Sequence, residues 1–127
     1  MKKNVPLSRF LTRVLIGSAT LCASPVLFAA CTYSVDNEWG NGYTASITIK
    51  NDTNATVNGW RVNWNYATNR VTNSWNANLS TTLPYAATNM SWNGRLGAGE
   101  SVSFGFQVDK QGGSAERPAL TGSLCSG

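Results

Sequence analysis

Three tryptophans stand beside turn-forming residues rather than inside apolar runs. Trp39 lies in NEWGNG, Trp75 in TNSWNAN and Trp92 in MSWNGR. Side chains two residues apart share one face of a strand, so a core tryptophan should have apolar residues at both of those positions. Trp39 and Trp75 have mainly polar residues there, and Trp92 stands between a methionine and a glycine. The pattern predicts that these three indoles are exposed to solvent.

A cluster of exposed indole rings is typical of a binding surface. A flat aromatic face can stack on the C–H face of a sugar ring, or on a nucleobase. Asn, Gln and Ser side chains near these tryptophans both donate and accept hydrogen bonds, which suits a ligand rich in hydroxyl groups. An indole has only two side-chain torsions to fix, so such a platform is nearly preorganised. The chemistry therefore favours a sugar polymer as the ligand.

The start of the chain predicts an export signal over residues 1–30. A basic stretch, MKKNVPLSRFLTR, is followed by the apolar and small-residue run VLIGSATLCASPVLFAA. This order of basic, apolar and small residues is that of a secretory signal peptide. The alternative, a membrane-spanning helix, is disfavoured because the run is short and is interrupted by Gly17 and Pro25. Residues 31–127 then form the mature protein, which is long enough for one domain.

Removing the leader changes the charge of the protein. The whole chain has 10 basic and 6 acidic residues and a net charge of +4. Four of the basic residues and none of the acidic ones lie in the leader, so the mature chain is neutral. A neutral chain has no excess of positive charge to attract a phosphate backbone or an anionic membrane. We therefore expect neither nucleic acid nor membrane as a partner of the mature form.

Two of the three cysteines remain after export, because Cys22 leaves with the leader. Cys31 and Cys125 stand at the two ends of the mature chain, and such a pair in an exported protein favours a disulfide. In the chain-entropy model, closing so long a loop contributes about 4–5 kcal/mol to stability. The alternative is a lipid anchor on Cys31, since LFAAC resembles a lipobox. That anchor leaves Cys125 without a partner, so the disulfide is favoured.

Strands with one apolar face must position the three tryptophans. Apolar residues alternate with polar ones over 43–50, 60–66 and 101–109, which is typical of half-buried antiparallel strands. Within 60–66, Trp60 and Trp64 share the apolar face and are predicted to be core. Weaker strands are expected at 32–37, 70–75, 88–92 and 120–125, with turns at 40–42, 51–59, 93–100 and 110–118. Short strands and frequent turns predict an all-β antiparallel sandwich.

The segment 31–125 resembles family 2 carbohydrate-binding modules, the cellulose-binding domains of bacterial cellulases and xylanases. The resemblance rests on VDNEWGNGYTASITIKN, VNGWRVNW, VTNSWNANL, MSWNGRLGAGESVSFGFQ and the closing LTGSLC. It implies an immunoglobulin-like or jelly-roll-like β-sandwich closed by a terminal disulfide, and a flat strip of three tryptophans matching Trp39, Trp75 and Trp92. The polar positions that line the family's binding face correspond to Asn37, Asn73, Ser103 and Gln107.

The resemblance also implies a subtype. In the xylan-binding subtype an arginine three residues after the first tryptophan props that ring upright, and the last tryptophan is missing. This chain has Gly42 at the first position and keeps Trp92. Both features resemble the cellulose-binding subtype, in which the rings lie in one plane. The implied partner of the secreted, monomeric module is insoluble polysaccharide: crystalline cellulose, or else chitin.

Two other functions compete with this interpretation. A small secreted glycoside hydrolase needs two placed carboxylates, but the six in the mature chain stand mostly in or near turns without an evident pair: Asp36, Glu38, Asp52, Glu100, Asp109 and Glu116. The chain has no histidine, which removes histidine-based catalysis and histidine-ligated metals. We expect no catalytic residue, metal or cofactor. The third function, a cell-surface adhesin or structural subunit, would gain support from a lipid on Cys31.

Overall fold

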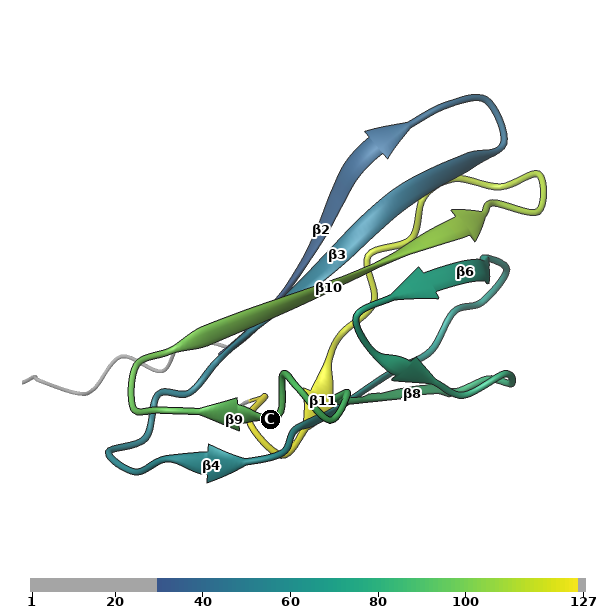
Figure 1. Ribbon diagram of the computed structural model, residues 1–127. Helices are drawn as coiled ribbons and strands as arrows, with labels where there is room; N and C mark the ends of the chain where they lie inside the picture. The colour runs from purple at the N-terminus through teal and green to yellow at the C-terminus, as the bar shows by residue number, and fades with distance from the viewer. Residues whose placement is uncertain (1–29, 126–127) are drawn as a thin grey trace, which may run out of the picture.

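The computed structural model describes residues 30–125, which form two facing antiparallel sheets and a small ribbon (Figure 1). The first sheet has the order β2 (Cys31–Glu38), β3 (Gly42–Lys50), β10 (Ser101–Asp109) and β6 (Arg70–Trp75). The second has the order β11 (Thr121–Gly122), β5 (Arg61–Trp64), β8 (Tyr85–Thr88) and β7 (Asn78–Leu79). The ribbon pairs β4 (Val57–Asn58) with β9 (Arg95–Leu96). The predicted all-β antiparallel sandwich is confirmed.

Alternation along the two long central strands builds the core. Phe104, Phe106 and Val108 of β10 turn inward and are almost fully buried. Trp60 stacks on Phe104 with ring centroids 5.4 Å apart, and Trp64 stacks on Phe106 at 5.1 Å. These rings join the first sheet to the second, and such aromatic pairs add to the stability from burial. The predicted core positions of Trp60 and Trp64 are confirmed, each being 3% exposed.

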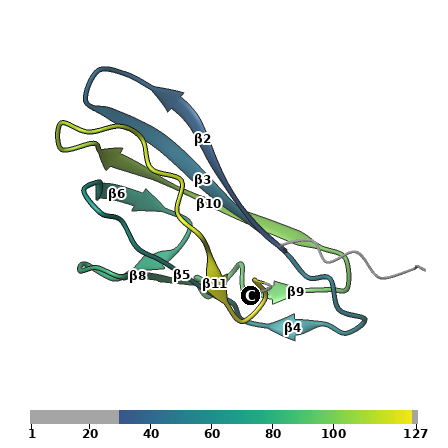
Figure 2. The same ribbon diagram turned by 180° about the vertical axis from the view of Figure 1, so that it is seen from behind.

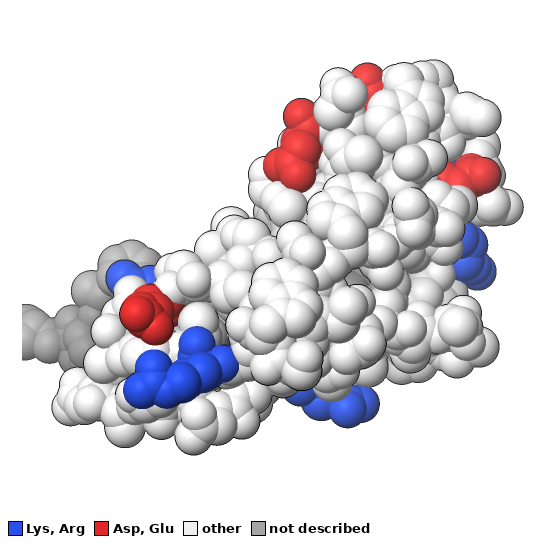
Figure 3. Space-filling model, in the orientation of Figure 1, with Lys and Arg blue, Asp and Glu red and all other residues white. Residues whose placement is uncertain are grey.

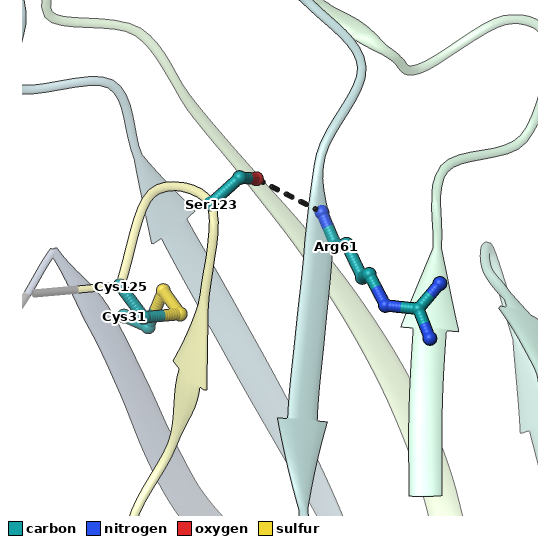
Figure 4. Close-up of a disulfide and its surroundings, with 4 residues drawn as sticks. All are labelled: Cys31, Arg61, Ser123 and Cys125. Carbon is teal, nitrogen blue, oxygen red and sulfur yellow. Dashed lines mark hydrogen bonds between the residues drawn. A yellow bond between two sulfur atoms is a disulfide. The ribbon is translucent and has the colours of Figure 1, made fainter. Parts of the chain in front are cut away.

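A disulfide joins Cys31, the first residue of β2, to Cys125, which follows β11 (Figure 4). The two cysteines are 94 positions apart in sequence, so the bond closes nearly the whole described chain into one loop. Beside it, the backbone N–H of Arg61 donates a hydrogen bond to Ser123 Oγ at 3.3 Å and fixes the last turn against β5. The predicted disulfide is confirmed.

Several strand boundaries differ from the predictions. β2 and β6 agree closely with 32–37 and 70–75, but the strand predicted over 88–92 is wrong. β8 ends at Thr88, and residues 90–93 form a turn because polar side chains take up their backbone hydrogen bonds. The strand predicted over 120–125 shrinks to the two residues of β11, which lies beside β5 in the view from behind (Figure 2). β4, β7 and β9 were not predicted.

The predicted export signal lies outside the described residues, apart from residue 30. Residues 30–125 include no helix of the length and hydropathy that crossing a membrane requires.

Candidate functional site

The outer face of the first sheet is polar along its central strand, β10. Because side chains alternate, the phenylalanines and the valine of β10 face the core and the residues between them face outward. The outward residues are small or polar: Ser101, Ser103, Gly105, Gln107 and Asp109. No bulky side chain of β10 itself rises from this face, so groups on neighbouring strands can lie across it.

Four amide and hydroxyl side chains form one row across this sheet. Gln107 pairs with Thr44 of β3 on one side and with Asn73 of β6 on the other. Thr44 pairs in turn with Asn37 of β2. Cross-strand partners share a face, so this polar row runs over all four strands. The structure thus brings together Asn37, Asn73 and Gln107, three of the predicted site residues. Thr44 was missed, although its place opposite the apolar face of β3 was visible in the sequence.

Trp39 lies at one side of the polar row, in the turn between β2 and β3. Its backbone N–H donates to the carbonyl oxygen of Gly42 at 2.9 Å. The indole lies against Gly42, since a Cβ placed on that glycine would be 2.8 Å from Trp39 Nε1. Gly42 pairs with Asp109, the position two residues beyond Gln107 on β10. The ring is 42% exposed, as predicted from its polar sequence neighbours.

Trp75 lies at the other side of the polar row, at the end of β6. It pairs with Gly105 of β10, and its indole covers that glycine. A Cβ on Gly105 would be 2.6 Å from Trp75 Cε2 and closer still to Nε1. The Trp75 side chain is also 42% exposed. Gly105 and Asp109, the cross-strand partner of Gly42, are four residues apart on β10. The positions beneath the two indoles are therefore about 13 Å apart along this strand.

The turn that contains Trp92 is hydrogen-bonded to the residue that follows Trp75. The side chain of Asn93 donates from Nδ2 to the carbonyl oxygen of Asn76 at 2.7 Å, and its Oδ1 accepts the backbone N–H of Met90 at 2.7 Å. Asn76 directly follows Trp75 and has a φ of 68°, a left-handed conformation that asparagine tolerates. Trp92 is 66% exposed. The three indoles predicted to be exposed are therefore exposed.

Asn76 and Asn93 were not predicted as part of the site. Each is the residue that follows an exposed tryptophan, in the similar sequences SWNA and SWNG. The repeated Trp-Asn pair was the signal that could have found them. Their hydrogen bond joins the end of β6 to the turn that carries Trp92, so these two residues hold the two indoles next to each other.

Ser103 lies two positions beyond Gly105 on the same face. Its Oγ is 2.7 Å from Thr48 Oγ1 of β3, so the two hydroxyls share a hydrogen bond. A shallow hollow beside Trp75 includes Ser103 and Ser46 in its lining. The predicted site residue Ser103 therefore belongs to the same face as the polar row, at its Trp75 side.

An ion pair anchors the turn that carries Trp39. Lys110 Nζ donates to Glu38 Oε2 at 2.8 Å, and Glu38 directly precedes Trp39. The Lys110 side chain is almost buried, and its backbone N–H donates to the carbonyl oxygen of Asn41 at 2.9 Å. The hydrogen bond and charge of Lys110 lower the pKa of Glu38 below its ordinary value. The chain is thus held on both sides of Trp39 by one residue of the opposite loop.

The sequence model of the family described as cellulose binding domain matches residues 29–125. The chain belongs to the family 2 cellulose-binding domains. It is 56% identical over 110 residues to alpha-L-arabinofuranosidase C of Cellvibrio japonicus, covering 87% of this chain and 18% of that protein. It is 52% identical to endo-1,4-beta-xylanase B of the same organism, covering 94% and 20%. The chain spans about a fifth of the length of these curated relatives.

A solved structure also resembles this cellulose-binding domain. The chitin-binding domain of Chi18aC from Streptomyces coelicolor is 35% identical, with a TM-score of 0.58, over 72% of this chain and 89% of that one. The family consists of non-catalytic binding modules. Its members are β-sandwich domains, in agreement with the two sheets described above.

The carboxylates of the cellulose-binding domain serve its own structure. Glu116 accepts the backbone N–H groups of Ala67, Thr68 and Asn69 at 2.7–2.8 Å, and the hydroxyl of Thr68 at 3.0 Å. Partial burial raises the pKa of Glu116, but the hydrogen bonds from Asn69, Ala67 and Thr68 outweigh that effect and lower it to about 2. Glu116 therefore stays ionised and ties the loop before β11 to the start of β6.

The other five carboxylates also have local partners: Asp36 with Ser34, Glu38 with Lys110, Asp52 with Lys50, Glu100 with Gly97, and Asp109 with Gln111. Such contacts with near neighbours or a basic side chain are those of turn caps and surface ion pairs. Among residues 30–125, His, Cys, Asp and Glu do not gather in groups of three that could hold a metal ion.

Charged side chains lie mainly at the margins of the face in Figure 3, and its centre is uncharged. Acidic and basic groups adjoin at the lower left of the view, and no basic patch extends across the centre of that face. A phosphate backbone needs several positive charges in a row, and this face does not offer them.

Proposed function

We propose that this domain is a secreted, non-catalytic module that adsorbs to the flat face of crystalline cellulose or chitin through Trp39, Trp75 and Trp92. The main support for this proposal is that the indoles of Trp39 and Trp75 pack against glycines of one sheet face, on either side of the polar row. Flat aromatic groups separated by hydrogen-bonding side chains suit a polymer whose sugar rings present C–H faces and hydroxyl edges.

The aromatic contacts supply most of the binding free energy in this proposal. Covering an exposed indole with a sugar ring removes apolar surface of both partners from water, which is favourable. The Asn, Gln and Thr side chains of the polar row exchange water for sugar hydroxyls, and such an exchange adds little net free energy. Their role is to orient the sugar chain across the strands.

Gly42 supports a flat ligand surface rather than a twisted chain. A side chain at this position would press on the ring of Trp39 and on the carbonyl oxygen of Val108, 2.9 Å from the Cβ position. With glycine there, the Trp39 ring can lie along the sheet face. The matching family is described as a cellulose binding domain and a similar solved structure is a chitin-binding domain, so we propose both polymers as ligands.

The disulfide supports export, because such bonds persist in oxidising compartments. We infer a mature form, residues 31–127, that acts outside the cell as a monomer without cofactor. The same bond occupies the Sγ atom of Cys31 and so disfavours the lipid-anchored alternative. The glycoside hydrolase alternative is disfavoured because each of the six carboxylates has a local partner within the described part of the chain.

A pull-down with residues 31–127 tests the proposal. The protein is mixed with crystalline cellulose, chitin or insoluble xylan, and the unbound fraction is measured over a range of concentrations. We expect saturable adsorption to cellulose or chitin and weak adsorption to xylan. Reducing-sugar release from amorphous cellulose is followed in parallel and should stay at background. Adsorption to none of the three, or sugar release above background, would contradict the proposal.

A further inference from the structure

Gly105 occupies a position where the backbone does not require glycine. It lies in the middle of β10, paired with both β3 and β6, and it is not among the glycines with a positive φ. A glycine inside a strand loses more conformational freedom on folding than alanine does, and it offers no side chain to pack. An alanine would therefore suit the strand better on backbone grounds alone, and the glycine needs another explanation.

The atoms above Gly105 give that explanation. It faces outward, yet it is buried, because the indole of Trp75 lies directly over it. The three heavy atoms nearest to a Cβ at this position are Nε1, Cε2 and Cζ2 of Trp75, all within 2.7 Å. These approaches are too short for real atoms. Since all three belong to one side-chain ring and none to the backbone, a methyl group there displaces the ring and leaves the strand in place.

We propose that Gly105 sets the tilt of the Trp75 ring and thereby restricts the binding face to flat polysaccharide surfaces. This inference rests on the proposed function and adds a second specificity-determining glycine to Gly42. With hydrogen at position 105, the indole lies down on the sheet. With any larger group there, the ring must rise at one edge, and a raised ring matches a twisted single chain instead of a level crystal face.

Gly105 is a cleaner test of ring tilt than Gly42. A Cβ on Gly42 would press on Trp39 Nε1 and also on the backbone oxygen of Val108, so a substitution there disturbs strand pairing as well as the ring. Gly40 provides the matched control. It lies in the turn beside Trp39, away from the Trp75 ring, and a Cβ at that position would have no heavy atom within 4 Å.

The experiment compares Gly105→Ala, Gly40→Ala and Trp75→Ala with the unsubstituted residues 31–127. Adsorption isotherms on crystalline cellulose, chitin and insoluble xylan are recorded with the thermal midpoint of each protein. We expect Gly105→Ala to weaken adsorption to the crystalline polymer at least fivefold, to raise the ratio of xylan to cellulose adsorption, and to keep the thermal midpoint. The indole N–H NMR signal of Trp75 should shift while those of Trp60 and Trp64 stay in place. Gly40→Ala should behave as the unsubstituted protein.

The outcomes separate the inference from the proposed function. If Trp75→Ala loses adsorption while Gly105→Ala keeps both its adsorption and its selectivity, the inference about Gly105 is overturned and the proposed function stands. If Trp75→Ala adsorbs like the unsubstituted protein, the aromatic surface itself is not the binding site and both fail. A fall in thermal midpoint that accounts for the lost adsorption of Gly105→Ala also overturns the inference, because it assigns the glycine to folding.

Discussion

Replacing Trp75 by alanine should remove a large part of the adsorption and only a small part of the stability. The Trp75 side chain is 42% exposed, so with a tryptophan surface of about 250 Å² roughly 100 Å² is free to be covered by sugar. At about 25 cal/mol per Å² this area corresponds to about 2.5 kcal/mol. The resulting upper limit is a roughly 70-fold weaker affinity for the crystalline polymer.

The stability of this variant should fall by only about 1 kcal/mol, or 4–8 °C in thermal midpoint, because the ring rests on the surface of the sheet. Trp60 is the contrasting case. It is 3% exposed and stacked on Phe104, so Trp60→Ala should cost about 3–5 kcal/mol of stability. Trp75→Tyr keeps a flat ring and should retain most of the adsorption.

Adsorption isotherms and thermal unfolding of the three variants form the assay. The reasoning is refuted if Trp75→Ala unfolds as readily as Trp60→Ala, since the Trp75 ring is then part of the core. It is equally refuted if Trp75→Ala stays folded and loses less than threefold in affinity, since an exposed ring that contacts the ligand must contribute more.

Three further predictions concern the framework around the site. The pKa of Glu116 is lowered from its ordinary 4.5 to about 2, so its contribution to stability is present above pH 4.5 and is lost as the pH falls toward 2. The thermal midpoint of Glu116→Gln should therefore depend less on pH over this range. An unchanged pH profile would contradict the role of residues 67–69 as hydrogen-bond donors to Glu116. Reducing the disulfide should lower the free energy of unfolding by about 4–5 kcal/mol in urea titrations, and equal curves with and without reductant would refute this. Lys110→Met keeps the buried aliphatic part of the side chain but removes the ion pair with Glu38. The backbone N–H of Trp39 should then exchange its hydrogen with solvent faster, and adsorption should weaken severalfold. An unchanged exchange rate would show that the ion pair does not hold the turn.

The exposure of the tryptophans could be predicted because it depends on neighbours two residues away. The polar residues around Trp39 and Trp75 indicated that these rings are exposed, and the apolar residues around Trp64 indicated that its ring is in the core. Alternation is a local property and survives folding. The same reasoning found the long strands β3 and β10, in which apolar and polar residues alternate over nine positions.

The alignment of side chains across strands could not be predicted. The pairing register shifts between Val35 and Asn37 and again between Gln107 and Val108. Each such irregularity inserts a residue and changes the position that the following residues take in the sheet. Only after both shifts do Asn37, Thr44, Gln107 and Asn73 come into one row, so a family resemblance could give three of these residues but not their arrangement.

The prediction for the turn that carries Trp92 was wrong for a different reason. Alternation was extended through 88–92, but Asn89 and Asn93 use their side chains to satisfy backbone groups that a strand would pair. Asparagine competes with the sheet in this way at turns. The glycines under Trp39 and Trp75 were likewise not predictable as a pair, because a ring over a glycine on another strand is a contact of the folded protein.

The disulfide determines how this domain responds when it is pulled. Its two half-cystines lie at the two ends of the described sandwich, 94 positions apart in sequence. Tension applied between Cys31 and Cys125 passes from one sulfur to the other and bypasses the hydrogen-bonded ladders of the sheets. While the bond is intact, the loop of sequence that it encloses cannot be drawn out to its full length, so tension between these two residues cannot extend the domain.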